Sequence, residues 1–253
     1  MKGIRRHIGK AVLMLTDNIN TDQIIPSREM KSVSRFGLAD GLFANLRYLD
    51  AAAGGRIPDP DFVLNQYSCR GASILISASN FGCGSSREHA VWALHEYGFR
   101  VIIATSFGSI FYENCINNGI IPIVLDTAAI TQLTDALDRR ATNITVDLEH
   151  CLVSVENVKL NFSLNEDKRH MLLNGSNAID LTLRHKPAID QFLRTDKNDR
   201  PWVYDYMHCE LPEQLKTDHK NTGHREAQDS TESNTQAKSR AISQAKSRGQ
   251  TSD

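Results

Sequence analysis

A glycine-rich turn between an apolar run and a helical pattern is the feature that most constrains the fold of this chain. Residues 72–77 form a short apolar run, which is typical of a buried strand. Gly82 and Gly84 follow, and they allow positive φ angles and close approach of a ligand to the backbone. Ser85 and Glu88 then have the spacing of a capping box. The sequence therefore predicts a strand, a glycine turn and a helix that begins at Ser85.

This turn also has the composition of an anion site. A helix N-terminus presents unpaired N–H groups and a partial positive charge. Arg87 could hold a carboxylate with two parallel hydrogen bonds, and Ser85 and Ser86 add hydroxyl groups. Glycine before a serine cap also begins many helices that bind nothing, so a purely structural role of the turn is the alternative. The motif matches neither of the common nucleotide-binding loops, because it lacks Gly-Lys-Ser/Thr and the third glycine of G-x-G-x-x-G.

The remaining periodicity predicts an α/β fold with a mixed sheet flanked by helices. Strand, helix and strand alternate around the glycine turn, which predicts parallel pairing with ligands near the carboxyl ends of the strands. Further along, three runs alternate apolar and polar residues, as short antiparallel strands do. We expect strands at 100–104, 120–125, 144–148, 152–155 and 158–164, and helices at 109–118, 126–139, 166–173 and from 187 toward 194.

Composition gives little indication of a partner. The 253 residues carry a net charge of -1, which favours neither nucleic acid nor an anionic membrane. The apolar run 11–15 is too short for a signal segment or a membrane span, so we expect a cytoplasmic protein. From residue 211 to 253 aromatic residues vanish and polar residues dominate, which predicts a disordered tail after a domain spanning 1–210.

The five cysteines do not form a recognisable metal-binding pattern. Cys69, Cys83, Cys115, Cys151 and Cys209 are scattered, and no C-x-x-C pair occurs among them. An iron–sulfur cluster needs several thiolate ligands, which this chain does not offer by spacing alone. We therefore expect no metal ligands in this chain. Cys83 lies in the glycine turn, where a small thiol packs well, and we expect a structural role for it.

Several separated motifs resemble one known family. The residues NFGCGSSREHA at 80–90 and NTDQIIP at 20–26 are joined by a long match at 98–125 and by PDFVLN at 60–65 and NGSNAIDLTLRH at 174–185. In this order they resemble the small-subunit family of 3-isopropylmalate dehydratases, over about residues 8–192. That family is similar to the swivelling β/β/α domain at the C-terminal end of aconitase, so the resemblance implies this fold.

The resemblance also implies a reaction and a partner. The expected activity is hydro-lyase chemistry that isomerises 2-isopropylmalate and 3-isopropylmalate through isopropylmaleate. The chain would act only with a large subunit, which would carry a [4Fe-4S] cluster as Lewis acid. This chain would bind no cofactor alone, and its ligand would be a small dicarboxylate. A methylmalate or homoaconitate hydratase subunit, or a non-catalytic anion-binding regulatory module, remains an alternative.

Individual positions take their expected roles from the same resemblance. Ser85 matches the serine base, and Asp22 matches an active-site aspartate, although it could equally cap a turn. Substrate binding is expected from a set of four residues: Arg87, Ser86, Arg35 and Gly84.

Two positions depart from the family pattern. Asn20 replaces a common aspartate and Ser27 a usual lysine. Both departures leave Ser85 and Arg87 in place, but they bear on substrate specificity and activity.

Overall fold

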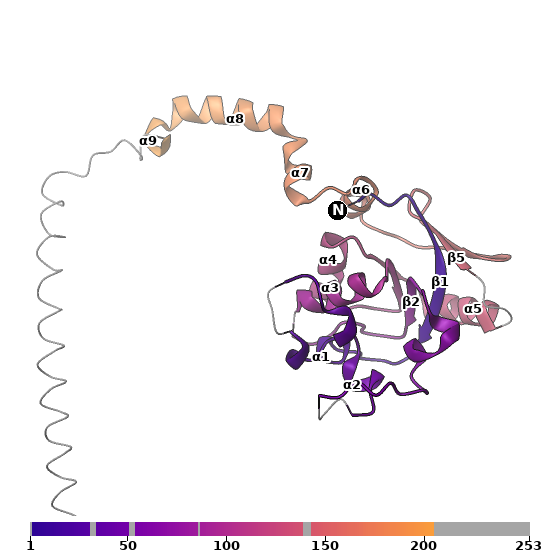
Figure 1. Ribbon diagram of the computed structural model, residues 1–253. Helices are drawn as coiled ribbons and strands as arrows, with labels where there is room; N and C mark the ends of the chain where they lie inside the picture. The colour runs from indigo at the N-terminus through magenta and orange to yellow at the C-terminus, as the bar shows by residue number, and fades with distance from the viewer. Residues whose placement is uncertain (1, 31–33, 51–53, 86, 139–142, 205–253) are drawn as a thin grey trace, which may run out of the picture. The chain divides into compact units, whose positions relative to one another are not determined.

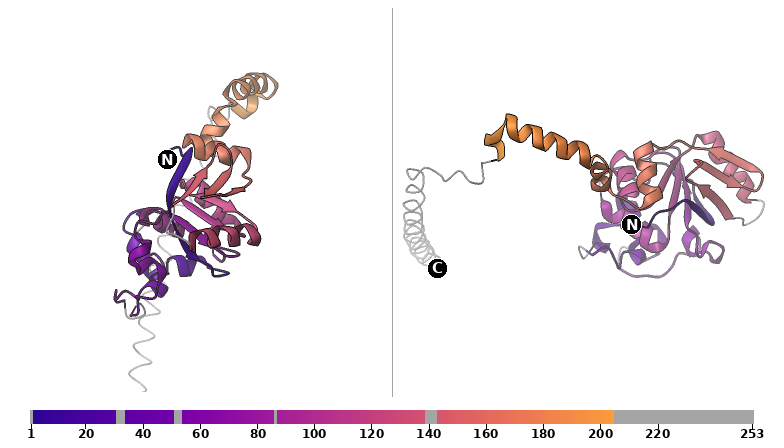
Figure 2. Two further views of the ribbon diagram at one scale, coloured as in Figure 1. Left: turned by 90° about the vertical axis from the view of Figure 1, so that its right-hand side faces the viewer. Right: turned by 90° about the horizontal axis from the view of Figure 1, so that it is seen from above.

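A seven-stranded mixed sheet forms the framework of the protein, and strand β1 (Arg6–Met14) joins its two halves. The computed structural model describes residues 2–30, 34–50, 54–85, 87–138 and 143–204. The strand order is β4-β3-β2-β1-β5-β6-β7. β1 pairs in parallel with β2 and antiparallel with β5, and in Figures 1 and 2 it runs between these two halves of the sheet. The predicted mixed sheet flanked by helices is confirmed.

The parallel half consists of β1, β2 (Ile74–Ser77), β3 (Val101–Ala104) and β4 (Ile121–Val124). The antiparallel half adds β5 (Asn143–Asp147), β6 (Leu152–Val155) and β7 (Val158–Asn161). The helices are α1 (Thr21–Ile24), α2 (Ala44–Arg47), α3 (Glu88–Tyr97), α4 (Ser109–Asn117), α5 (Thr127–Asp138), α6 (Glu166–Asn174), α7 (Ala178–Leu183), α8 (Lys186–Asp199) and α9 (Pro201–Tyr204). Short 3-10 turns lie at Ser27–Glu29, Ala39–Gly41, Val63–Asn65 and Tyr67–Cys69.

Alternation along the central strands places a hydrophobic core on each face of the sheet. Leu75 and Ile102 pack with α3 and with the segment that follows β1, whereas Ile74 and Ile103 pack with α5, α6 and the antiparallel strands. All four side chains are fully buried. Complete burial of such a side chain stabilises the fold by about 1.5–3 kcal/mol. The two cores therefore hold the carboxyl ends of β1, β2 and β3 in a rigid frame.

Sequence periodicity located most of these elements but missed β1 and the short helices α1, α2 and α7. The expected strands and helices from β2 to α8 all occur, with ends shifted by a few residues. Gly98 is the C-cap of α3 and has a φ of 125°, which glycine adopts more readily than other residues. The sequence pattern predicts no strand at residues 6–14, where charged and glycine residues interrupt the apolar run. Strand formation in this segment depends on the partners that lie on both sides of it.

Contacts divide the chain into two compact units, Met1–His185 and Lys186–Asp253. The sheet and both cores belong to the first unit. Within the second, Asp196 on α8 accepts hydrogen bonds from Arg200 and from the Tyr204 hydroxyl at 2.7 and 2.8 Å. The expected domain end at residue 210 and the tail of residues 211–253 lie outside the described residues. Among the described helices, none has the length and hydropathy needed to span a bilayer.

Candidate active site

The glycine turn after β2 has no room for a Cβ at its tightest point. Gly82 has a φ of 73°, and a Cβ on it would lie 2.1 Å from the ring of Phe111. Gly84 also has a positive φ, of 87°, but it is exposed and has more space around it. The first glycine therefore permits packing, and the second leaves the backbone accessible from solvent.

The turn is bonded to the segment that follows β1. The backbone N–H of Gly82 donates to the carbonyl of Ile19 at 2.7 Å, and the N–H of Thr21 donates to the carbonyl of Cys83 at 3.1 Å. The buried Thr21 hydroxyl donates to the carbonyl of Ser85 at 2.6 Å. These bonds join two segments that lie more than sixty positions apart in the sequence, and they fix the backbone at Ser85.

The loop after β3 supports the turn from its other side. Phe81 is fully buried and packs edge-on against the rings of Phe107 and Phe111, with centroid distances of 6.3 and 5.4 Å. Its backbone N–H donates to Ser106, and its carbonyl accepts from Gly108 at 2.9 Å. The ends of three parallel strands thus build one site, at the edge of the sheet where ligands gather in such folds.

Three of the predicted site residues come together at this edge. Asp22 lies in the first turn of α1, and its carboxylate forms an ion pair with Nη1 of Arg87. The side chain of Asp22 is 54% exposed and that of Arg87 is 26% exposed. Ser85 is exposed two residues before Arg87, and its hydroxyl makes no hydrogen bond to any described residue. A hydroxyl, a guanidinium and a carboxylate are therefore presented together to solvent.

The predicted start of the helix was wrong. α3 begins at Glu88, its N-cap is Arg87, and no side chain forms a cap bond there. The carboxylate of Glu88 instead accepts a hydrogen bond from Nδ2 of Asn118 at 2.8 Å. The cause is that the carbonyl of Ser85 is held by Thr21, which keeps this part of the turn outside the helix. The Ser85 side chain is consequently not used as a helix cap.

Sequence reasoning also missed the cap of the opposing helix. Asn20 is the N-cap of α1, where its Oδ1 accepts from the N–H of Gln23 at 2.9 Å and its own N–H donates to Oε1 of Gln23 at 2.9 Å. The spacing Asn-x-x-Gln could have indicated this capping box. Asn20, which departs from the family pattern, therefore has a structural role, and Asp22 is not the cap residue. Ser27 begins a 3-10 turn and is exposed.

Arg35 packs against α3. Its guanidinium carbon is 5.0 Å from the centre of the Trp92 ring on α3. The carboxylate of Glu96 accepts three backbone N–H bonds, from Gly37, Leu38 and Ala39, at 2.6 to 2.9 Å. These bonds attach the loop to α3 next to Arg35. Ser86, the remaining predicted substrate-binding residue, lies outside the described residues.

The carboxylate of Asp17 stabilises the backbone just before the glycine turn. Asp17 accepts from the hydroxyl and the backbone N–H of Ser79, at 2.6 and 2.9 Å. These two bonds, the hydroxyl bond foremost, lower the pKa of Asp17. Asp17 therefore acts as a fixed anion that positions the backbone just before the glycine turn.

Metal-ligating side chains do not converge in the described part of the chain, where no group of three or more His, Cys, Asp or Glu could hold an ion. Cys69, Cys83, Cys115 and Cys151 are all free thiols. Burial raises the pKa of Cys115 well above its ordinary value, which keeps that thiol protonated. These donors do not fit an iron–sulfur cluster within the described residues.

Comparisons with known proteins agree with this architecture. Residues 1–128 match the family model of the aconitase C-terminal domain. A crystal structure of 3-isopropylmalate dehydratase from Methanocaldococcus jannaschii aligns with a TM-score of 0.53 and 26% identity. That alignment covers 74% of this chain and 99% of the archaeal chain. The fold expected from the motifs is confirmed.

Curated relatives extend the match over most of the sequence. The 3-isopropylmalate dehydratase small subunit of Cupriavidus necator is 51% identical over 207 residues, which cover 81% of this chain and 99% of the relative. The protein of the same name from Agrobacterium fabrum is 44% identical over 205 residues, which cover 80% of this chain and all of the relative. Together with the mixed sheet and the glycine turn, these matches establish that the chain belongs to the family of 3-isopropylmalate dehydratase small subunits, which are components of aconitase-like hydro-lyases.

Proposed function

We propose that this chain is the small subunit of an enzyme that interconverts 2-isopropylmalate and 3-isopropylmalate by removing water and adding it back, with isopropylmaleate as the intermediate. The observation that carries the proposal is the group at the carboxyl edge of the sheet. There, the hydroxyl of Ser85, which bonds to no described residue, lies on the same turn as Arg87, and Arg87 pairs with Asp22. The names of the relatives support the choice of substrate.

In this proposal Ser85 moves the proton. Elimination of water requires that a proton leaves the carbon next to a carboxylate, and Ser85 Oγ takes it and returns it during readdition. A serine oxygen is a weak base, so it needs nearby positive charge. Arg87 supplies that charge from two residues away. The bond from Thr21 to the Ser85 carbonyl fixes the backbone from which the hydroxyl projects.

Arg87 holds a substrate carboxylate. A guanidinium has five N–H donors in a planar fork, and the ion pair with Asp22 engages Nη1. The remaining donors suit a second, bidentate carboxylate. Asp22 then acts as the group that orients Arg87. Gly84 adds an open backbone beside the substrate, because it has no Cβ and is exposed.

The remaining predicted residues have less support from contacts. Ser86 is proposed to bind the same carboxylate as Arg87. Arg35 is proposed to contact the substrate from the loop attached to α3, next to Trp92.

A large subunit completes the site in this proposal. Hydroxide is a poor leaving group, and an iron–sulfur cluster in the large subunit would supply the Lewis acid that polarises it. The described residues of this chain assemble no comparable set of ligands. The exposure of Ser85 and Asp22 suits a half-site that a second protein covers. The small-subunit names of the relatives imply the same partner.

The proposal is tested by mixing this chain anaerobically with a cluster-loaded 3-isopropylmalate dehydratase large subunit. Isopropylmaleate is followed by ultraviolet absorbance, with each chain alone as a control. We expect turnover only in the mixture, and its loss when the small subunit carries Ser85→Ala. Ser163→Ala is the matched control, because Ser163 is also an exposed serine but lies after β7.

Other results of the same experiment would reject the proposal in different ways. Turnover of methylmalate or homoaconitate, but not of isopropylmalate, would assign the chain to a related hydratase. A complex that forms but turns over none of these substrates would indicate a regulatory module. Turnover by this chain alone would contradict the division of the active site between two subunits.

A further inference from the structure

A cavity of about 860 Å³ lies at the edge of the sheet opposite to the Ser85 turn. It is bordered by the start of β1, the residue before β3 and the carboxyl ends of α3 and α4. Because β1 and β3 are parallel, these are their amino ends, whereas the glycine turn follows the carboxyl end of β2. The cavity is therefore distinct from the candidate active site.

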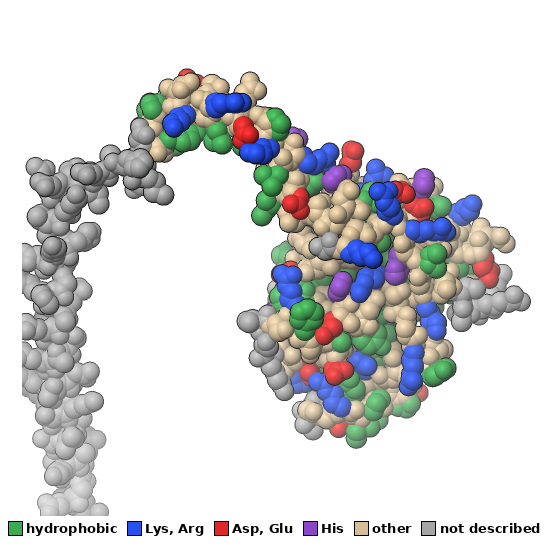
Figure 3. Space-filling view, turned by 45° about the horizontal axis from the view of Figure 1, so that its top comes forward, with side chains coloured by type: hydrophobic (Ala, Val, Ile, Leu, Met, Phe, Trp, Pro, Cys, Tyr) green, Lys and Arg blue, Asp and Glu red, His purple; other side chains and the backbone are tan. Residues whose placement is uncertain are grey.

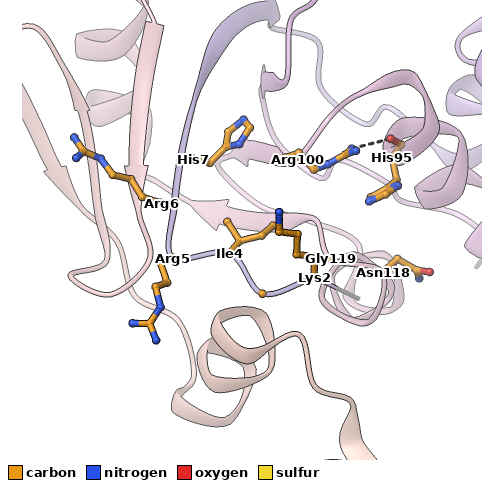
Figure 4. A pocket seen from close by; sticks show the side chains of 10 residues that line it. Lys2, Ile4, Arg5, Arg6, His7, His95, Arg100, Asn118 and Gly119 are labelled. Carbon is orange, nitrogen blue, oxygen red and sulfur yellow. Dashed lines mark hydrogen bonds between the residues drawn. The ribbon is translucent and has the colours of Figure 1, made fainter.

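Most of the side chains that line this cavity are basic, and no aspartate or glutamate is among them. Figure 4 shows His7, Arg100 and His95 in a row, with the amino group of Lys2 directed toward the same space. Arg5 and Arg6 also border the cavity, but they point away from its centre, and Arg5 pairs with Glu149. In the space-filling view, lysine, arginine and histidine side chains gather near the middle of the globular part (Figure 3).

Structural hydrogen bonds use only some of the N–H donors of Arg100. Its Nη1 donates to the carbonyls of His95 and Phe99, at 2.7 Å each. These bonds satisfy the end of α3 and offset the partial negative charge of that helix terminus. The other N–H groups of the guanidinium have no acceptor among the described residues. Arg100 can thus cap the helix and still donate into the cavity.

The positive charge of Arg100 acts on both histidines of the cavity. Nε2 of His7 lies 2.8 Å from the hydroxyl of Ser73, while the ring of His95 has no hydrogen-bond partner among the described residues. Burial lowers the pKa of both imidazoles, and the charge of Arg100 lowers each of them further. No carboxylate that lines the cavity counters this effect. An anion there would be attracted to all of these groups at once.

We propose that this cavity binds a small oxyanion with two or more negative charges, of the phosphate or polycarboxylate type. Donors approach from two sides, with Lys2 facing His7, His95 and Arg100. Such an arrangement suits a compact ligand with several acceptor oxygens, because charged hydrogen bonds to one group reinforce each other. A multivalent anion would also stabilise the protonated histidines, which a monovalent ion does less well.

The proposal is tested by titrating the full chain with inorganic phosphate and, separately, with succinate, at constant ionic strength. Imidazole nitrogen signals of His7 and His95 are followed by NMR at several pH values. We expect at least one of the two anions to shift both rings and to raise their pKa values. Saturation by phosphate and not by succinate would identify the phosphate class, and the reverse would identify the polycarboxylate class.

Three variants locate the site. His95→Gln and Lys2→Gln remove groups that make no hydrogen bond to a described residue, so the fold should persist. Each should weaken binding by about tenfold. Lys159→Gln is the matched control, because this exposed lysine lies on β7. It should leave the affinity unchanged.

Two results would overturn the assignment of this cavity. One is the absence of saturable shifts at His7 and His95 with both anions, or shifts that sodium chloride reproduces at equal ionic strength. The other is an equal loss of affinity in Lys159→Gln and His95→Gln. Neither measurement involves the large subunit or isopropylmalate, so the result is independent of the proposed function.

Discussion

At the scale of single residues, the Ser85 group is arranged for chemistry more than for stability. The ion pair between Asp22 and Arg87 is partly exposed, and such pairs contribute about 0–1 kcal/mol to folding. The Ser85 hydroxyl contributes no hydrogen bond to any described residue. Loss of these side chains should therefore change activity far more than the free energy of unfolding.

Ser85→Ala should lower kcat of the assembled enzyme by about 10²–10⁴-fold, because it removes the group that transfers the proton. The free energy of unfolding should change by less than about 0.5 kcal/mol, since Ser85 does not cap α3. Steady-state kinetics in the mixture and urea denaturation of the isolated chain check both values. A loss of about 1 kcal/mol in stability with normal turnover would instead reveal a capping serine.

Arg87→Lys should mainly raise KM, by about tenfold or more. Lysine keeps the charge and can still pair with Asp22, but it cannot offer the planar fork to a second carboxylate. Measurement of kcat and KM separately in the complex tests this role. Unchanged values of both constants would remove Arg87 from the substrate site. Arg184→Lys, at the C-cap of α7, is a suitable control.

At the scale of elements, the site depends on short segments that are stabilised by specific bonds. α1 has only four residues, and a helix of that length does not persist without support. Its capping box and its bonds to the glycine turn provide this support. The loop with Arg35 is similarly attached to α3 by the carboxylate of Glu96. Each attachment can be tested by a conservative substitution.

Asn20→Ala should destabilise the chain by about 1 kcal/mol, because it removes the side-chain half of the capping box on α1. Asn20→Asp should keep the stability, since aspartate is an equally good N-cap. Thermal or urea unfolding of both variants provides the measurement. Equal losses in the two variants would mean that the amide group of Asn20 has another role.

Glu96→Gln should make the stability of the protein less sensitive to acid. Burial alone would raise the pKa of Glu96, but three backbone N–H donors outweigh it and lower the pKa below the ordinary value of 4.5. A carboxylate with a lowered folded pKa contributes stability above the unfolded value, and it loses this contribution as pH falls through the folded value.

The wild type should therefore exceed Glu96→Gln in stability at pH 6, by up to about 1 kcal/mol after screening. The difference should shrink as the pH falls below 4.5. Urea denaturation across this range checks the prediction. A difference that stays constant with pH would show that the negative charge of Glu96 is not involved.

At the scale of the whole molecule, β1 brings the parallel and antiparallel halves into one sheet, and the two opposite edges of the parallel half present different surfaces. One edge carries Ser85 and its neighbours, and the other carries the basic cavity. About a fifth of this chain has no counterpart in one of its relatives. The Cupriavidus necator protein is matched over 99% of its length by 81% of this chain.

Deletion of residues 211–253 should leave both assembly and turnover within about twofold of the full chain, a change of less than 0.5 kcal/mol. These residues are mostly polar and include no aromatic side chain, so they offer little apolar surface to pack against the domain or a partner. Affinity for the large subunit and kcat in the mixture are the measurements. Abolished activity would assign these residues a role in the enzyme.

Local patterns in the sequence determined a large part of this structure. Buried apolar runs indicated β2, β3 and β4, because a strand with both faces covered needs no polar residues. Gly82 and Gly84 marked positions with positive φ, which few other residues adopt. The combination of several motifs in order identified the family. These features depend on residues close together in the chain, so the sequence alone contains them.

Tertiary structure decided where the site residues meet. The ion pair between Asp22 and Arg87 joins positions 65 residues apart, and the bond from Thr21 to Ser85 moves the start of α3 to Glu88. The contact between Arg35 and Trp92 likewise joins residues that are distant in the sequence. Local spacing favoured a cap at Ser85, but a long-range hydrogen bond stabilised a different backbone. Such competition between local and distant partners is settled only when the strands are assembled and the loops at their ends come into contact.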